Sequence, residues 1–396
     1  MDPLIEVRDV EASEARESGE RRLGRWLDRL AAVGFLVILS VPALLFAGGV
    51  RPPSIENRDP AVFPRVSLRG LTDPAFYAGI DRFLADNLPL RNEAVQAHAA
   101  VDNRVLGGTS NPDVVVGVGD WLFNRGEMEP RCDFSAAQVL DKVDRVAAGL
   151  KATGRVFRYI VAPDKHTVYP DKLPPDSPFG TPCSDQSRAQ LRAGLVARPG
   201  SAVDAWTPVL AARAADPTKP FYYTLDDHWT PLGATLAIKA LVQSLAPGVW
   251  NDREVTVDGT EQHLGDMSTL MGLPRSETIP RVVMRPGLKV DRRILDTGIH
   301  IHQSRDIPWF TVTGNAPVVP GRTLIVYDSF FGTVMNETSP WFQESVWVHE
   351  GDLLNHPELA DVLPAFDTVV FQRVERSAYF TDPASDLATI IAKPKR

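Results

Sequence analysis

The chain has 396 residues, of which 44% are hydrophobic and 23% charged, so it can bury a sizeable core and is not disordered throughout. Its 42 lysine and arginine residues against 50 aspartate and glutamate residues give a net charge of −8, which argues against a nucleic-acid-binding surface. At this length we expect one large domain or two modest ones.

An uncharged stretch near the N-terminus predicts a membrane-spanning helix. Residues 30–50 contain no charged side chain, and about 20 helical residues span the hydrocarbon core of a bilayer. Residues 1–29 alternate acids with arginines and are expected to form a solvated cytoplasmic tail, because basic residues before the span favour a cytoplasmic N-terminus and an exported body. A cleaved signal peptide and a buried soluble helix are the alternatives.

The next segment is predicted to connect this anchor to the main domain. Residues 51–72 contain four prolines and show no sustained hydrophobic period, which is typical of a tether. From Asp73 to about Val105 the apolar residues recur at helical spacing, so we expect an amphipathic helix. Residues 51–105 therefore form the link, and residues 106–396 the catalytic domain.

Beyond residue 105, short apolar strands alternate with helices. A hairpin is expected at Val114–Gly117 with Trp121–Phe123, strands at Val156–Ala162, Phe221–Leu225, Thr323–Tyr327 and Thr368–Gln372, and helices at Ser135–Thr153, Val203–Ala215 and Pro231–Leu245. This alternation predicts an α/β domain with a mostly parallel sheet flanked by helices. Reactive residues in such sheets collect at the carboxyl ends of the strands.

The two cysteines fit an exported domain. Cys132 and Cys183 both follow the predicted span, in surroundings rich in proline and polar residues. Because an oxidising compartment allows thiols to pair, we expect a disulfide between them. Two unrelated free thiols are the alternative.

Two predicted strand ends contain residues suited to nucleophilic catalysis. Tyr222–Trp229 includes Asp226 and His228, and Leu324–Gly332 includes Ser329. A serine at a strand exit exposes its hydroxyl, but it needs a histidine to take its proton and a carboxylate to orient that histidine. Asp226 and His228 would share one face of an extended segment. The alternatives are a helix cap at the serine and a solvated Asp–His surface pair.

These segments also resemble a known family. Asp226–Trp229 and Tyr327–Phe330 are similar to the paired motifs of the alginate O-acetyltransferase family, whose domains are SGNH-hydrolase-like. Further blocks resemble that family in the same order: Gly119–Phe123, Ala162–Lys165, Tyr169–Pro174, Gly265–Met267, Met271–Pro274, Phe366–Val370 and Val374–Arg376. The resemblance extends from about Phe83 to Arg376.

The resemblance implies an SGNH-hydrolase-like domain with Ser329 as nucleophile, His228 as general base and Asp226 as the carboxylate that orients it. The chain order Asp, His, Ser is permuted, because ordinary SGNH esterases have the serine first. The residues alone leave Asp227 as a competitor of Asp226. The backbone N–H of Ser329 is the expected oxyanion donor, and neither a cofactor nor a metal is expected.

The resemblance further implies an O-acetyltransferase that acetylates hydroxyl groups of an exopolysaccharide through a serine acyl-enzyme. A multi-spanning membrane acyltransferase would supply the acetyl groups, and the protein would lie in a bacterial inner membrane, single-pass, with its catalytic domain in the periplasm. Two other functions fit the same residues. One is a carbohydrate acetylesterase, and the other is a non-catalytic anchored subunit that binds polysaccharide.

Overall fold

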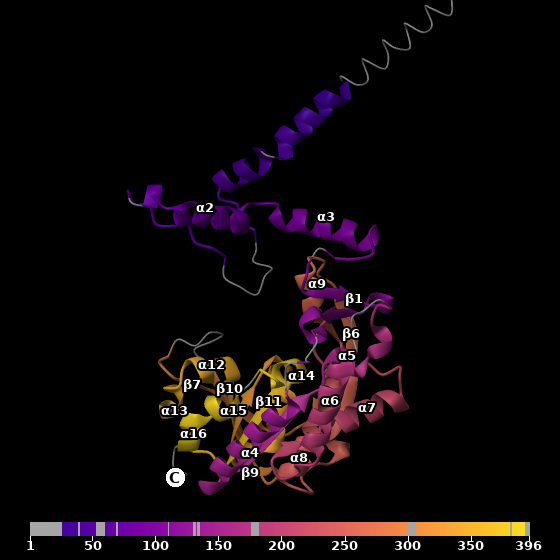
Figure 1. Ribbon diagram of the computed structural model, residues 1–396, viewed down its shortest axis with the longest axis vertical. Coiled ribbons are helices and arrows are strands. Elements are labelled where there is room, and N and C mark those ends of the chain that lie inside the picture. Colours follow the sequence, from indigo (N-terminus) through magenta and orange to yellow (C-terminus); the bar gives the residue numbers. More distant parts are fainter. Residues whose placement is uncertain are drawn as a thin grey trace, which may run out of the picture. The chain divides into compact units, whose positions relative to one another are not determined.

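The computed structural model describes residues 26–38, 40–52, 60–68, 70–109, 111–129, 132, 135–175, 182–299, 306–380 and 382–392. Contacts within the chain divide it into two compact units, Met1–Val101 and Asp102–Arg396 (Figure 1). Each unit is described by itself.

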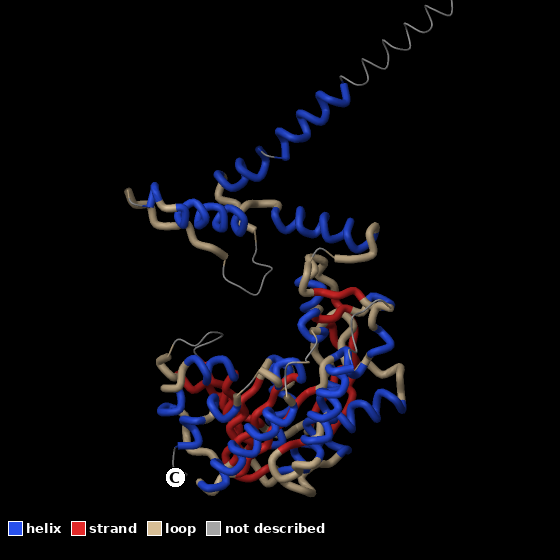
Figure 2. The backbone as a smooth tube through the Cα atoms, viewed as in Figure 1, coloured by secondary structure: helices blue, strands red, loops and turns tan. Residues whose placement is uncertain are grey.

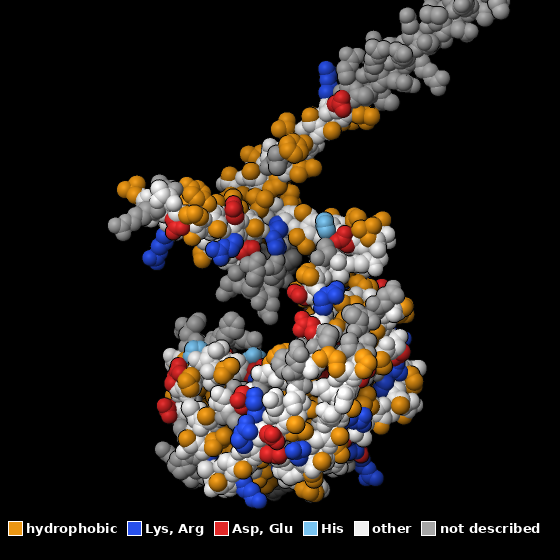
Figure 3. All heavy atoms as spheres, viewed as in Figure 1, with side chains coloured by type: hydrophobic (Ala, Val, Ile, Leu, Met, Phe, Trp, Pro, Cys, Tyr) orange, Lys and Arg blue, Asp and Glu red, His pale blue; other side chains and the backbone are white. Residues whose placement is uncertain are grey.

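The first unit contains an apolar helix at the position of the predicted span. This helix covers Trp26–Ala47, outside residue 39, and is long and apolar enough to cross a membrane. Figure 3 shows hydrophobic side chains along it. Residues 1–25 of the predicted tail lie outside the described part of the chain. These observations are compatible with a single-pass anchor.

Two helices replace the single amphipathic helix expected after the tether. They are α2 (Pro74–Asn87) and α3 (Arg91–Arg104). Helix α2 ends before Pro89, which has no N–H to continue the hydrogen-bond ladder. Leu90, between the two helices, adopts a left-handed φ of 66°. The apolar residues at helical spacing, from Phe76 to Leu84, all lie in α2, so the amphipathic pattern extends over only the first of the two helices.

The second unit is built on a mostly parallel sheet, as predicted. Within the described residues, seven strands follow the order β4-β3-β11-β9-β10-β8-β7. The parallel strands are β4 (Ala202–Val203), β3 (Val156–Ala162), β11 (Thr368–Val374), β9 (Val319–Tyr327) and β10 (Phe342–His349). Two antiparallel strands, β8 (Asp306–Val312) and β7 (Val290–Asp296), extend the sheet at one edge. Strands buried on both faces appear in the sequence as continuous apolar runs, which explains why β3 and β11 could be found from it.

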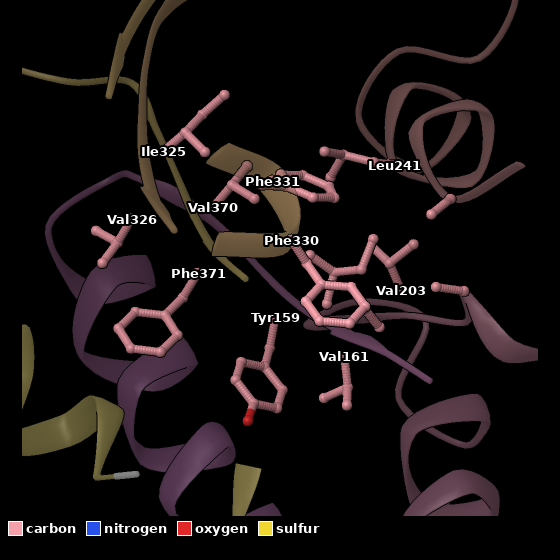
Figure 4. Close-up of a cluster of buried hydrophobic side chains, with 14 of the residues drawn as sticks. Tyr159, Val161, Val203, Leu241, Ile325, Val326, Phe330, Phe331, Val370 and Phe371 are labelled. Atoms are coloured by element: carbon pink, nitrogen blue, oxygen red, sulfur yellow. The ribbon is translucent and has the colours of Figure 1, made fainter. Parts of the chain in front are cut away.

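Helices flank this sheet (Figure 2). The longer ones are α4 (Ala136–Ala152), α6 (Pro182–Val196), α7 (Trp206–Ala215) and α8 (Pro231–Leu245). Thr230 caps α8, because its hydroxyl accepts the N–H of Gly233 and Pro231 occupies the first turn. In the core between the layers, Tyr159 and Phe371 are cross-strand neighbours whose ring centroids lie 6.1 Å apart (Figure 4).

The second unit also contains short helices, several of which follow strand ends. They are α5 (Lys165–Val168), α9 (Asp266–Leu270), α10 (Ser329–Gly332), α11 (Met335–Thr338), α12 (Glu350–Asn355), α13 (Leu359–Val362), α14 (Glu375–Ala378), α15 (Pro383–Asp386) and α16 (Ala388–Ala392). Single turns of 3₁₀ helix occur at Gly70–Thr72, Val118–Asp120, Arg125–Met128, Pro170–Lys172, Asp252–Glu254 and Ser339–Trp341.

In the described part of the chain, two antiparallel hairpins lie outside the main sheet. The predicted one pairs β1 (Val114–Val116) with β2 (Leu122–Asn124). The other, β5 (Val255–Leu264) with β6 (Ser276–Met284), was not predicted.

The expected strand at Phe221–Leu225 is wrong. This segment is a loop in which Tyr222 and Trp229 form one isolated bridge. Two of its backbone groups bond to a side chain, because the carboxylate of Glu277 accepts the N–H groups of Thr224 and Leu225.

The predicted disulfide is confirmed. Cys132 and Cys183 are bonded, with Cα atoms 5.1 Å apart and a sequence separation of 51. Replacing both cysteines by serine should lower the free energy of unfolding by about 2–4 kcal/mol, because the cross-link restricts the unfolded chain. Urea denaturation of the oxidised protein and of the double variant measures the difference. Equal midpoints would contradict this expectation.

Candidate active site

Parallel strands bring three polar strand ends to one edge of the sheet. Asp164 and Lys165 follow the end of β3, Asp328 and Ser329 follow β9, and Glu375 and Arg376 follow β11. Because β3, β11 and β9 are neighbours, these ends meet at the carboxyl edge. The loop before α8 reaches the same edge.

Contacts with Phe330 join that loop to α10. The indole Nε1 of Trp229 donates to the carbonyl of Phe330 at 2.9 Å. The rings of His228 and Phe330 have centroids 4.9 Å apart. The structure therefore brings His228 beside the residue that follows Ser329.

Asp226 and His228 form a short side-chain pair. His228 Nδ1 lies 2.7 Å from Asp226 Oδ1, which also accepts the backbone N–H of His228 at 2.9 Å. The His228 side chain is only 12% exposed. Its Nε2 is buried and has no hydrogen-bond partner among the described residues. The ring thus has one nitrogen held by a carboxylate and the other available.

Ser329 is exposed at the first position of α10. Asp328 fixes the turn: its two carboxylate oxygens accept the N–H groups of Phe330 at 2.9 Å and Val374 at 2.6 Å. The N–H of Asp328 donates to Gln372 Oε1. Since His228 Nε2 has no partner in the described part of the chain, the Ser329 hydroxyl is not hydrogen-bonded to it in this structure. Catalytic hydrogen bonds are often longer without substrate.

Carboxylates around His228 set its charge. Burial alone would lower the pKa of His228, but the hydrogen bond to Asp226 and the negative charges of Asp226, Asp227 and Asp266 raise it to about 9. Burial would raise the pKa of Asp226, but hydrogen bonds from His228 and His263 hold it below its ordinary value. Asp226 is therefore ionised and can only accept hydrogen bonds.

Asp227, the competitor left open by the sequence, has a different partner. Arg376 donates to Asp227 Oδ2 at 2.5 Å and to Asp164 Oδ1 at 2.7 Å. Both carboxylates are almost completely buried, at 2% and 1% exposure. Asp227 thus belongs to a buried ion cluster, whereas Asp226 faces the imidazole.

Sequence reasoning did not find the hydrogen bonds that hold the loop. Lys165 is fully buried, and its Nζ donates to the carbonyls of Leu122, Thr224 and Asp226. Burial lowers the pKa of Lys165 to about 8. Lys165 lies 59 and 61 residues from its two loop partners, so no local pattern could have indicated these bonds.

The segment Gly265–Met267 supports the loop from another side. Asp266 accepts the N–H of Asp227, and the Ser268 N–H donates to the Leu225 carbonyl. A Cβ on Gly265 would lie 2.4 Å from that carbonyl oxygen, so only glycine permits this close approach. Ligand atoms of Asp226, His228 and Asp266 lie within 4.8 Å of one another. Because Asp226 and His228 already bond to each other directly, we assign this group to an imidazole–carboxylate pair.

A family model matches the centre of this unit. Residues 114–288 match the description "SGNH hydrolase-like domain, acetyltransferase AlgX". Through this segment the chain is similar to the SGNH-hydrolase-like acetyltransferase family. Asp226, His228 and Asp266 lie inside the matched SGNH-like segment, whereas Ser329 and Arg376 lie beyond it.

Curated relatives are similar to this chain over part of its length. A probable alginate O-acetylase AlgJ from Pseudomonas fluorescens is 25% identical over 197 residues, covering 48% of each chain. The Pseudomonas putida protein of the same name is 27% identical over 164 residues, 40% of each chain. The chain thus spans about half the length, or less, of these relatives. Among solved structures, the O-acetyltransferase domain of Pseudomonas putida AlgJ is 19% identical with a TM-score of 0.45, covering 72% of this chain and 99% of that one.

Proposed function

We propose that this SGNH-like protein transfers acetyl groups to hydroxyl groups of an exopolysaccharide through an acetyl-Ser329 intermediate. The observation that supports this most directly is the 2.7 Å bond between Asp226 and His228 beside the turn that exposes Ser329. Curated relatives named as alginate O-acetylases indicate the chemistry and an exopolysaccharide as the acceptor class.

In the first half-reaction, Oγ of Ser329 attacks the acetyl carbon of the donor. His228 Nε2 takes the serine proton and returns it to the leaving oxygen as the bond from the acetyl carbon to that oxygen breaks. Asp226 accepts the Nδ1–H, so the lone pair of neutral His228 is at Nε2. The backbone N–H of Ser329 is the proposed oxyanion donor.

In the second half-reaction, a sugar hydroxyl attacks the acetyl-serine. His228 removes the hydroxyl proton and gives a proton back to Ser329 Oγ as the acyl bond breaks. In an esterase, water would attack the acetyl-serine in place of the sugar hydroxyl. The two activities therefore differ only in which hydroxyl reaches the acyl-enzyme.

Incubation of the full chain with an acetyl ester, with and without oligosaccharides, tests the proposal. Acetylated oligosaccharide supports a transferase. Release of acetate alone would make the protein an esterase, and no turnover together with binding of oligosaccharide would make it a binding subunit.

The rate should rise steeply with pH below about pH 9. A general base must be neutral, and with a pKa of about 9 only about one His228 in 100 is neutral at pH 7. We expect kcat/KM for an acetyl ester to rise about tenfold per pH unit up to about pH 9 and then level off. Asp266→Asn removes a negative charge that raises the pKa of His228, so its profile should shift to lower pH. A wild-type plateau that begins near pH 7 would contradict this expectation.

We also propose the location and the donor. Residues 30–50 would anchor the protein in a bacterial inner membrane, with residues 1–29 as a cytoplasmic tail. Residues 51–105 would form the periplasmic link and residues 106–396 the periplasmic catalytic domain. Since a single helix forms no conduit for acetyl groups, a multi-spanning membrane acyltransferase would deliver them to the periplasmic face.

The anchor gives a separate prediction. A reporter fused at the C-terminus should be exported, and the full chain should stay with membranes after a high-salt wash, because the apolar helix Trp26–Ala47 is held by the hydrocarbon core. Recovery of a soluble species that lacks about the first 50 residues would indicate a cleaved signal peptide instead.

A further inference from the structure

A second histidine binds the carboxylate that orients His228. Nε2 of His263, on β5, lies 2.7 Å from Asp226 Oδ2. The His263 side chain is 28% exposed, and its ring stacks on Tyr223 with centroids 3.8 Å apart. No sequence pattern singled out this residue.

Each carboxylate oxygen of Asp226 is hydrogen-bonded to one of the two histidines. Oδ1 accepts from His228, through both its backbone N–H and Nδ1, and Oδ2 accepts from His263 and from the backbone N–H of Asp266. Because ionised Asp226 can only accept, the imidazole nitrogens that face it each bear a hydrogen. Rotation of this carboxylate would break hydrogen bonds to both rings at once.

The hairpin β5–β6 positions His263. His263 pairs across this hairpin with Glu277, and the Glu277 carboxylate accepts the N–H groups of Thr224 and Leu225. The same hairpin therefore binds the backbone of the loop through one residue and the Asp226 side chain through the neighbouring one. Such double support is what a precisely oriented carboxylate requires.

We propose that His263 is a positioning residue of the active site. Its Nε2–H fixes the Asp226 carboxylate, and the carboxylate in turn keeps the hydrogen of His228 on Nδ1 and the lone pair on Nε2. The kinetic part of this inference rests on the proposed function, whereas the state of the His228 ring does not.

The test compares His263→Phe, which keeps a flat ring but loses the donor, with His263→Gln, whose amide N–H supplies one. We expect His263→Phe to slow the acetylation of Ser329 by an acetyl ester by roughly 10-fold to 100-fold, the usual effect of one hydrogen bond to a charged group. KM for the ester should stay unchanged, and His263→Gln should recover most of the rate. The control is His356→Phe, because His356 is also about one-quarter exposed (27%) and hydrogen-bonded to a carboxylate, that of Glu358. It should acetylate Ser329 at the wild-type rate.

A second readout needs no turnover. The Nδ1–H of His228 should give a downfield proton resonance that is absent from His228→Ala. This resonance should persist in His263→Gln and shift or disappear in His263→Phe. An unchanged resonance and rate in His263→Phe would overturn the positioning role. A wild-type protein with the resonance but no acetylation of Ser329 would overturn the proposed function alone, and the resonance in His263→Phe would still decide the role of His263.

Discussion

Ser329→Ala should abolish acetyl transfer and leave the fold intact. Without Oγ no atom can accept the acetyl group, so the rate should fall by on the order of 10⁴-fold or more. The turn itself should survive, because its hydrogen bonds come from the carboxylate of Asp328 and Ser329 is exposed. Transfer assays and mass spectrometry of the peptide that contains residue 329, after exposure to an acetyl ester, measure the loss of acetylation, and urea denaturation measures whether the fold is intact.

The other two residues of the proposed triad should behave as one unit with Ser329. His228→Ala and Asp226→Ala should each lose most activity, and the double variants should be hardly worse than the singles. Ser385→Ala, which removes an exposed hydroxyl on α15, is the matched control and should keep wild-type activity. Asp227→Ala is no neutral comparison, because it also removes a partner of buried Arg376. Wild-type transfer by Ser329→Ala would reject the assignment of the nucleophile.

The sequence predicted the fold best where side chains are buried on both sides. Strand β3 has the predicted bounds Val156–Ala162, and in β11 every residue is buried. By contrast, β5 has almost no buried side chains, so its pairing with β6 leaves no hydrophobic alternation to find. The loop at Phe221–Leu225 has the aromatic residues typical of a strand, but its backbone is bonded to the side chains of Glu277 and Lys165.

The same contrast applies to the candidate site. Asp226, His228 and Ser329 could be selected from local sequence, because each lies in a short motif beside a recognisable element. Lys165 and His263 could not, because they reach Asp226 from 61 and 37 residues away and only the folded chain brings them there. Local motifs thus revealed the residues proposed to react, while the residues that orient them depend on tertiary structure.

Arg376→Met should destabilise the second unit severely. Arg376 is the cation bonded to both Asp164 and Asp227, which are 1% and 2% exposed. Methionine fills similar space without charge, so two buried carboxylates lose their partner, at a cost of about 3–5 kcal/mol. Burial already raises the pKa of Asp164 above its ordinary value, and without Arg376, whose charge lowers the pKa of Asp227, burial would raise the pKa of Asp227 as well. Since a raised pKa makes folding less favourable as pH rises, the deficit should be larger at pH 7 than near pH 4.

Arg281→Met is the matched control for this variant. Arg281 also pairs with an aspartate at 2.5 Å, but Arg281 and Asp258 are 50% and 68% exposed, so its loss should cost no more than about 1 kcal/mol. Urea denaturation of both variants at pH 7 and pH 4 measures the difference. Equal losses of stability in the two variants would contradict this expectation. They would mean that the buried carboxylates are neutral when Arg376 is absent. Because Arg376 also holds Asp227, the neighbour of His228, Arg376→Met should lose acetyl transfer together with stability, whereas Arg281→Met should lose neither.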